Sequence, residues 1–450
     1  MHDLVVIGGG GAGLTAALSA KKTNIDAHIT LISNEKLSYS PCSLPFVIAG
    51  EIPSLDRVTH DLAEICRESG IECVIDTVSE IDAKKKIVKT VSGKEFPYLS
   101  LVIASGGLPS IPPTKGSELA GVYALQWIGD ARKIMDELKT AKNAVIIGGG
   151  SVGIEVAEAF IKRGLKVVLV QRSEHVLRRP LDPDFSEMVE KKLSDNGVEI
   201  LFNTPVNEIA GKDGHVQSVA VPGRVIPADI VVFGVGAKPN VALAQKAGIE
   251  TREGGINTDD LMQTNIKDVY AAGDCVGSKS LVTGKVMLSQ LGTTAIRQGT
   301  VAGINAVGGY VTFEGVLNSM VLKIFDMEIG RTGLTLADAE EAGIETVIGL
   351  ASGKTKAEYF PGAADVHVKL IFSALNRRLI GAQVVGAEGV SGKVDLLAYA
   401  IADNSEIVEL MKLKYCYTPP ITPSHNIIVL AAENAFKKLR RIMEVRKKRF

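Results

Sequence analysis

A glycine-rich loop that occurs twice restricts the fold of this chain more than any other feature of its sequence. The first copy follows an apolar, strand-like segment at residues 3–7 and precedes a helix-like segment at 14–20. Its GxGxxG glycines are Gly8, Gly10 and Gly13. In this context the first glycine makes the turn, the second lets the backbone approach a pyrophosphate, and the third lets helix and strand pack. The phosphates are expected at the helix N-terminus, where free N–H groups favour anions.

The second copy begins 140 positions later, between a strand-like segment at 143–147 and a helix-like segment at 154–163. Its glycines are Gly148, Gly150 and Gly153. Two complete motifs at a domain-sized separation indicate two dinucleotides, one per domain. The sequence therefore predicts an α/β fold with two Rossmann-like dinucleotide-binding domains.

The residues after the second strand of each motif differ in charge. In the first domain Glu35 follows this strand, and it either accepts a ribose hydroxyl or is a solvated turn residue. In the second domain Gln171 and Arg172 occupy this region, and Arg178 and Arg179 follow. A neutral residue beside arginines removes the repulsion of a 2′-phosphate, so the second site is expected to accept NADPH as well as NADH.

Further carboxylates accompany the two motifs. Glu155 and Glu158 lie one turn apart on the second helix, either on a solvated face or near the junction of nicotinamide and flavin. Asp274 ends a strand-like segment in Ala-Ala-Gly-Asp, which places it at the carboxyl edge of a sheet, where α/β folds bind ligands. Cys275 directly follows and is expected to pack in the core.

Cys42 lies between Pro41 and Pro45, soon after the first glycine loop. The prolines argue against a core strand and favour the irregular start of a helix. There the helix dipole would lower the thiol pKa and raise the thiolate population. The alternative is a small buried apolar residue, which is the usual role of a free cysteine.

Bulk composition narrows the classes of function. The formal net charge of −1 gives no electrostatic case for nucleic-acid binding, and no apolar run is long enough to span a membrane. The five cysteines form no CxxC pair, so neither a disulfide framework nor a metal site is predicted. A reducing, cytoplasmic setting is expected.

The C-terminal third changes in character. Residues 366–372 and 379–385 predict an antiparallel hairpin, and helices are expected at 392–402 and 405–412. A proline-rich loop follows, and such loops often carry function. In it Cys416 is expected to be buried rather than to act as a resolving thiol, and His425 is expected to be a surface residue.

With these motifs the chain resembles the pyridine nucleotide–disulfide oxidoreductases over nearly its whole length. The resemblance implies an FAD domain made of residues 1–112 and 247–320, an NAD(P) domain at 113–246, and an α+β interface domain at 321–450 that forms a homodimer. Residues of the first motif and Asp274 would then bind FAD, and those of the second motif would bind NAD(P)H.

Within that family, Ser38–Phe46 is similar to the single-cysteine branch of CoA-disulfide reductases, persulfide or polysulfide reductases and NADH oxidases. Pro41 replaces the asparagine that is common there. Residues 417–420 resemble a Tyr-Ala-Pro-Pro element whose tyrosine reaches the partner's active site, and residues 359–362 resemble a region that supplies a second tyrosine. The resemblance thus implies catalytic roles for Cys42, Tyr417 and Tyr359.

The function implied is reduction of a small sulfur acceptor by NAD(P)H through FAD and Cys42. CoA persulfide, polysulfide and CoA disulfide all suit one thiol beside a flavin, with CoA a candidate bound thiol. Two alternatives stay open: an NADH oxidase that reduces O₂, and an NADH-oxidising flavin subunit of a larger electron-transfer complex. The cysteine spacing fits no iron–sulfur cluster within the chain itself.

Overall fold

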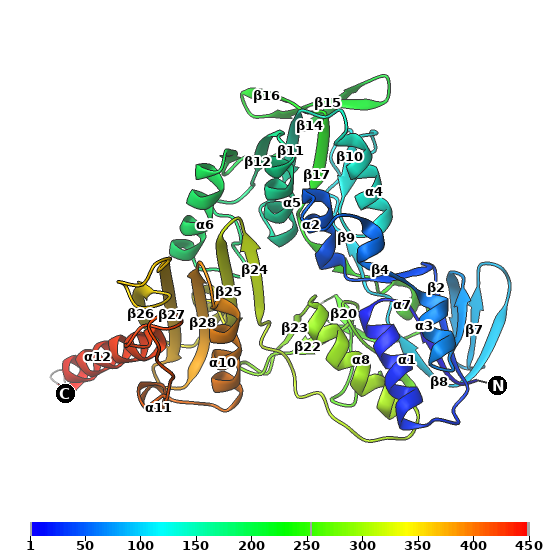
Figure 1. Ribbon diagram of the computed structural model, residues 1–450. Coiled ribbons are helices and arrows are strands. Elements are labelled where there is room, and N and C mark those ends of the chain that lie inside the picture. The colour runs from blue at the N-terminus through cyan, green and yellow to red at the C-terminus, as the bar shows by residue number, and fades with distance from the viewer. Residues whose placement is uncertain (1, 253, 448–450) are drawn as a thin grey trace.

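The first glycine loop follows β1, an interior strand of a mixed seven-stranded sheet, in the computed structural model, which describes residues 2–252 and 254–447 (Figure 1). The sheet order is β5-β2-β1-β8-β7-β6, and β21 pairs with β8. The strands next to the loop are parallel, whereas β6 and β7 form an antiparallel extension. The strands are β1 (His2–Ile7), β2 (Ile29–Ser33), β5 (Glu72–Ile75), β6 (Val78–Asp82), β7 (Ile87–Thr90), β8 (Glu95–Ile103) and β21 (Val269–Ala271).

Two helices of this domain meet backbone to backbone. A Cβ atom at Gly299 of α8 (Gly292–Ala306) would lie 2.3 Å from the carbonyl oxygen of Ala12 in α1 (Gly11–Thr23). One at Gly303 would lie 2.1 Å from the carbonyl oxygen of Ala16. Small residues on both helices therefore permit a very close approach, and they join the two separated segments of the first domain.

The second glycine loop lies on a parallel five-stranded sheet of order β10-β17-β11-β12-β13. A three-stranded antiparallel sheet, β14-β15-β16, forms the top of the molecule in Figure 1. The strands are β10 (Val122–Ala124), β11 (Asn143–Ile147), β12 (Lys166–Val170), β13 (Val198–Leu201), β14 (Glu208–Lys212), β15 (His215–Val221), β16 (Arg224–Pro227) and β17 (Ile230–Phe233). The helices are α4 (Ile128–Glu137), α5 (Ser151–Lys162) and α6 (Pro183–Asp195).

Two short strands mark the chain crossings between these domains. β9 (Gly107–Pro109) pairs antiparallel with β18 (Ala237–Pro239). Beside this pair, the Ser105 hydroxyl donates to the carbonyl of Asn240 at 2.7 Å. The outgoing and returning connections are therefore bonded to each other.

The third domain is an antiparallel five-stranded sheet of order β24-β25-β28-β27-β26 with helices packed on it (Figure 1). The predicted hairpin corresponds to β27 and β28. The elements are β24 (Met320–Ile324), β25 (Met327–Gly333), β26 (Thr346–Lys354), β27 (Asp365–Ser373), β28 (Leu379–Gly386), α10 (Val390–Ala402), α11 (Ile407–Met411) and α12 (Ile427–Lys447). Within residues 2–252 and 254–447, no helix has both the length and the apolar character that a membrane crossing requires.

One part of the first segment packs in an unexpected place. Helix α2 (Leu44–Ala49) follows Cys42, and its residues Leu44, Val47 and Ile48 belong to the same buried cluster as Ile154 and Phe160 of α5. The cysteine-bearing segment is thus packed on the core of the second domain. The predicted fold class is confirmed, while the domain boundaries remain predictions.

Candidate active site

The first glycine loop forms a cradle that is closed on one side and open on the other. Gly8 has φ +106°, and a Cβ atom there would lie 2.2 Å from the carbonyl oxygen of Ala104. A Cβ atom at Gly13 would lie 1.9 Å from the Gly8 carbonyl oxygen. By contrast, Cβ atoms at Gly10 and Gly11 would meet nothing within 4 Å. The loop therefore fits a dinucleotide whose pyrophosphate approaches the backbone at Gly10 and Gly11.

The second loop repeats this geometry. Gly148 has φ +103°, and a Cβ atom at Gly153 would lie 2.0 Å from the Gly148 carbonyl oxygen. At Gly150 the single close neighbour is the Gly234 carbonyl oxygen, 3.0 Å from the added Cβ. The residues of the second motif thus also fit a pyrophosphate at a helix N-terminus.

Glu35 contacts a tyrosine rather than open solvent. The Tyr39 hydroxyl lies 2.9 and 3.0 Å from the two Glu35 carboxylate oxygens and accepts a hydrogen bond from the Ile128 N–H at 3.0 Å. Burial raises the pKa of the Glu35 carboxyl against the lowering effect of Tyr39. The reading of Glu35 as a solvated turn residue is therefore wrong, and its ribose contact remains a prediction.

The Gln171 side chain is hydrogen-bonded to the loop that follows it. Its side-chain oxygen accepts the Gly149 N–H at 2.9 Å, and its side-chain nitrogen donates to the Ser173 hydroxyl at 2.7 Å and to the His175 carbonyl at 2.8 Å. The Leu177 N–H donates to the Gly149 carbonyl at 2.8 Å. The loop is thereby fixed against the second cradle.

The arginines on this loop are available for a ligand. Arg172, Arg178 and Arg179 are exposed, and none has a hydrogen bond or ion pair within the described residues. Since the loop that carries them is bonded to Gly149, their guanidinium groups lie on a fixed segment beside the second cradle.

Cys42 lies in a short 3₁₀ turn (Pro41–Ser43) at the start of α2, as the flanking prolines predicted. Its side chain is exposed, so the reading as an inert core residue is wrong. The predicted direction of its pKa is also wrong. Desolvation by the surrounding protein, and then the negative charge of Glu155, raise the pKa of the Cys42 thiol.

Glu155 and Glu158 do not form a solvated face. Burial, and then the charge of Glu158, raise the pKa of the Glu155 carboxyl to about 7. Glu158 is 6% exposed and pairs with Lys162 at 2.6 Å, and Lys162 also pairs with Glu51 at 2.7 Å. The half-buried Glu155 is therefore a group that exchanges a proton near neutral pH, close enough to Cys42 to affect its charge.

Asp274 follows β21 and is half-buried. Burial raises the pKa of its carboxyl, and its charge in turn contributes to the raised pKa of Cys42. The preceding Gly273 N–H donates to the side-chain oxygen of the fully buried Gln298 at 2.9 Å. Cys275 is buried, as predicted. The carboxylates of Glu155 and Asp274 thus both act on the Cys42 thiol, although the three residues come from separate segments.

The two tyrosines from the third domain lie together. Tyr359 is 76% exposed and Tyr417 is 50% exposed, and their hydroxyl oxygens are 3.4 Å apart. The hydrogen bond between the two hydroxyl groups raises the pKa of Tyr417. The predicted burial of Cys416 is wrong, because its thiol is exposed in this chain. His425 is exposed, as predicted.

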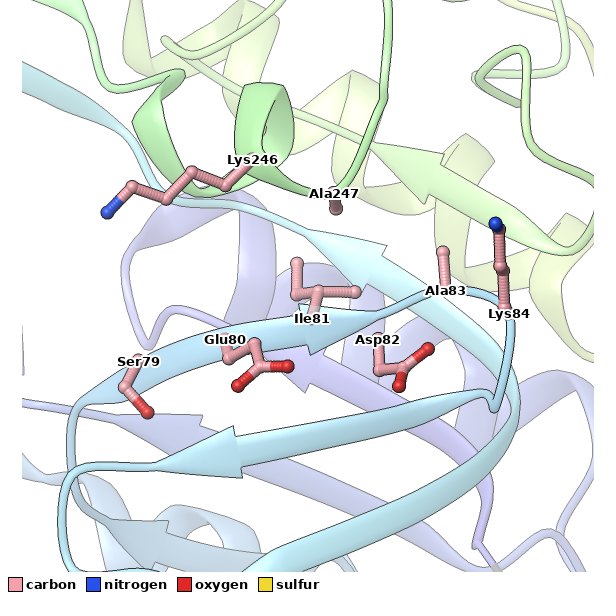
Figure 2. A pocket seen from close by; sticks show the side chains of 8 residues that line it. All are labelled: Ser79, Glu80, Ile81, Asp82, Ala83, Lys84, Lys246 and Ala247. Carbon is pink, nitrogen blue, oxygen red and sulfur yellow. The ribbon is translucent and has the colours of Figure 1, made fainter.

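A hollow elsewhere on the first domain contains none of these residues. Figure 2 shows it between β6 and α7 (Ala242–Lys246). Its lining is Ser79, Glu80, Ile81, Asp82, Ala83, Lys84, Lys246 and Ala247. The lining carries charges of both signs and no thiol, so this hollow does not compete with Cys42 as the centre of sulfur chemistry.

Two family models match most of the chain. Residues 2–299 match the pyridine nucleotide-disulphide oxidoreductase model, and residues 320–426 match the dimerisation domain of the same family. The chain belongs to the pyridine nucleotide-disulphide oxidoreductase family. It is therefore an oxidoreductase with two dinucleotide-binding cradles. Its third domain is a dimerisation domain, which supports a homodimer.

Several relatives of this oxidoreductase are similar over most of their length. An NADH oxidase of Methanocaldococcus jannaschii is 40% identical over 97% of this chain and 99% of its own. A CoA-dependent NAD(P)H sulfur oxidoreductase of Pyrococcus abyssi is 33% identical over 95% of this chain and 97% of its own. The NAD-dependent persulfide reductase of A. fulgidus has a TM-score of 0.95 at 35% identity and covers 98% of this chain and 84% of its own.

Proposed function

We propose that this protein is an FAD-dependent NAD(P)H oxidoreductase that reduces a sulfur acceptor, a CoA persulfide, polysulfide or CoA disulfide, through Cys42. The observation that carries the proposal is an exposed thiol directly before a helix that packs on the core of the second domain, with carboxylates from both dinucleotide-binding domains in its electrostatic environment. The names of the Pyrococcus and A. fulgidus relatives support the same acceptor class.

The proposed cofactor sites follow from the two cradles. Residues Gly8, Gly10, Gly13 and Asp274 would hold FAD, and Gly148, Gly150 and Gly153 would hold NAD(P)H. Bound FAD would supply two-electron transfer from NAD(P)H to the sulfur–sulfur bond that forms at Cys42. The remaining steps are thiol–disulfide exchange, in which thiolate fraction and the pKa of the leaving thiol set the rate.

Cys42 would carry the sulfur chemistry. As a thiolate it attacks one sulfur of the acceptor, a Cys42–sulfur bond forms, the acceptor S–S bond breaks, and the departing thiolate takes one proton. Two electrons from NAD(P)H then break the new bond, which releases the second thiol and restores Cys42. The balance is NAD(P)H, one proton and one S–S bond converted to NAD(P)⁺ and two S–H groups.

The protons have candidate carriers within the chain. Glu155, with a pKa of about 7, can accept the Cys42 proton and return it at neutral pH. The Tyr359–Tyr417 pair can protonate the leaving thiolate. Because both tyrosines are exposed on the dimerisation domain, we propose that they reach Cys42 of the partner subunit, so that each active site is shared across the dimer.

The nucleotide site is proposed to accept NADPH, through Arg172 and Arg178. An engineered water-forming NADPH oxidase bound to NADPH differs from its parent by substitutions that include arginine and serine at consecutive positions and arginine five positions after the serine. This chain has Arg172, Ser173 and Arg178 at the same spacing. Two guanidinium groups suit a 2′-phosphate because charge-assisted hydrogen bonds are stronger than hydrogen bonds between neutral groups.

The test compares NAD(P)H oxidation by the wild-type holoenzyme and Cys42→Ser with CoA persulfide, polysulfide, CoA disulfide or O₂ as acceptor. We expect Cys42→Ser to keep its flavin and to lose at least about 100-fold of its sulfur-acceptor turnover, as loss of a nucleophile does. Cys416→Ser, which removes the other exposed thiol, is the matched control and is expected to retain activity. Unchanged sulfur turnover in Cys42→Ser would refute the proposal.

A second candidate function is reduction of O₂, which the name of the Methanocaldococcus relative favours. The O₂ arm of the same experiment separates the two. Wild-type turnover with O₂ that exceeds turnover with every sulfur acceptor would make the oxidase reading the better one.

A further inference from the structure

Where three adjacent strands of the first sheet begin, at the end away from the glycine loop, two imidazoles and a carboxylate lie close together. His2 begins β1, His28 precedes β2, and Glu72 begins β5. The His28 Nε2 atom lies 3.3 Å from Glu72 Oε2, and the His2 Nδ1 atom lies 3.7 Å from the same oxygen. One ligand atom from each residue lies within 4.8 Å of the others.

We propose that His2, His28 and Glu72 form a binding site for a divalent transition-metal ion such as Zn²⁺. Bond lengths of about 2.0–2.1 Å around a tetrahedral Zn²⁺ place neighbouring ligand atoms about 3.3–3.4 Å apart. The His28–Glu72 separation already has this value, and the His2–Glu72 separation is a few tenths of an ångström longer. Imidazole ligands select such ions over Ca²⁺ or Mg²⁺.

The backbone holds these ligands in place before any ion binds. The His28 N–H donates to the Asp3 carboxylate at 2.8 Å, and the Asp3 N–H donates to the His28 carbonyl at 3.0 Å. Glu72 lies directly opposite Thr30 in the parallel pairing of β2 with β5. Because strand pairing fixes all three positions, binding an ion requires only side-chain adjustment.

A buried hydroxyl orients two of the ligands. The Thr30 side chain is fully buried, and its oxygen lies 2.7 Å from His2 Nδ1 and 2.8 Å from Glu72 Oε2. One hydroxyl proton serves one acceptor, so Thr30 donates to the carboxylate when His2 carries its proton on Nδ1. A shift of that proton to Nε2 frees the Nδ1 lone pair for the ion while Thr30 still donates to Glu72. Such outer partners commonly orient metal ligands.

Two aromatic rings lie beside the His2 ring. It lies 4.6 Å from the His28 ring and 5.7 Å from the Phe96 ring, centroid to centroid. The bound ion would tie the first strand of the chain to β2 and β5, at the edge of the sheet away from the redox chemistry.

The experiment uses the full-length holoenzyme without a polyhistidine tag, freed of metal by a chelator and titrated with Zn²⁺ in a calorimeter at pH 7.5. We expect about one ion per chain, a dissociation constant of about 10 μM or tighter, and a rise in the thermal midpoint with zinc. The His28→Gln and Glu72→Gln variants are each expected to weaken binding at least about tenfold, which is the effect of losing one ligand.

Two matched variants separate this site from other surface ligands. Glu68→Gln removes a nearby exposed carboxylate on α3 (Leu62–Glu68), and His367→Gln removes a histidine of the third domain. Both should titrate as the wild type does. Binding of less than about half an ion per chain at 100 μM zinc by the wild type, or identical titrations of the wild type and Glu72→Gln, would overturn the proposal. NAD(P)H oxidation in the same variants should be unchanged.

Discussion

The two glycine loops have nearly the same backbone and different surroundings. The first glycines have φ +106° and +103°, and the third glycines leave 1.9 and 2.0 Å between an added Cβ and the opposing carbonyl oxygen. Yet α1 has no acidic residue and lies against α8, whereas α5 carries Glu155 and Glu158 and lies against the helix that follows Cys42. The backbone therefore determines that a dinucleotide binds, and the neighbouring side chains determine which one and what chemistry follows.

The residues after the second strands differ in the same way. The Gly8 N–H bonds the Ile32 carbonyl, and the Gly148 N–H bonds the Val170 carbonyl. Ser33 and Gln171 are thus structurally equivalent, and Glu35 lies two positions beyond Ser33. In the first domain this region is bonded to Tyr39, and in the second it is bonded to the arginine-bearing loop.

The largest expected effect distinguishes the two cradles directly. Valine at Gly10 or Gly150 has an allowed backbone conformation, because both residues are extended, and at most one carbonyl crowds the added Cβ. We expect Gly10→Val to lower the affinity for flavin at least about 100-fold, because the valine side chain fills the space for the pyrophosphate. Gly150→Val should keep its flavin, measured by absorbance, and raise the KM for NAD(P)H. Flavin loss from Gly150→Val alone would reverse the two assignments.

The next effect concerns the packing of α1, which has no counterpart at α5. An alanine at Gly303 would place its Cβ 2.1 Å from the Ala16 carbonyl oxygen, so the two helices must separate. We expect Gly303→Ala to lower the free energy of unfolding by about 1–3 kcal/mol, measured by urea denaturation of the holoenzyme. Gly392→Ala on α10, where nothing lies within 4 Å, is the control and should be neutral or stabilising. Equal effects would show that the close contact is not needed.

A smaller effect tests nucleotide choice. Arg172→Ala and Arg178→Ala are each expected to lower kcat/KM for NADPH by about tenfold, since a charge-assisted hydrogen bond contributes roughly 1.5–3 kcal/mol. The value for NADH should change little, because NADH has no 2′-phosphate. Arg132→Ala, an exposed arginine of α4 without a partner in the described structure, is the control. Parallel losses with both nucleotides would place these arginines outside the 2′-phosphate site.

The smallest effect tests the link between α5 and Cys42. The Glu155 charge raises the pKa of Cys42, so Glu155→Gln should lower that pKa and speed alkylation of the thiol by iodoacetamide about threefold at pH 8. Because the pKa of Glu155 is about 7, its carboxyl is ionised above that value and neutral below it. The difference between variant and wild type should therefore shrink towards pH 6.

Glu187→Gln, an exposed carboxylate of α6 without a partner in the described structure, is the control for this measurement. It should alkylate at the wild-type rate at every pH. A Glu155→Gln rate equal to that of the wild type at pH 8 would show that the two groups are not coupled.

The sequence by itself determined the parts that depend on local order. These parts are the strand–glycine loop–helix motifs, the third-domain hairpin and the proline-bounded start of α2. Each depends on the spacing of residues within a short segment, so it can be predicted without knowing which distant residues it contacts. The absence of a second cysteine near Cys42 was likewise visible from the sequence. These features gave the family resemblance, which the family models confirm.

Only the tertiary structure decided the charges and contacts between distant segments. The pKa of Cys42 is raised by desolvation from the surrounding protein and by Glu155, which lies more than a hundred positions away, so the prediction from the local helix dipole was wrong. Cys416 is exposed although we predicted from the sequence that it is buried. Likewise, His2, His28 and Glu72 meet only because β1, β2 and β5 are parallel neighbours. Desolvation and Coulomb interactions act through space, so the folded structure determines which groups are near enough to change one another's pKa.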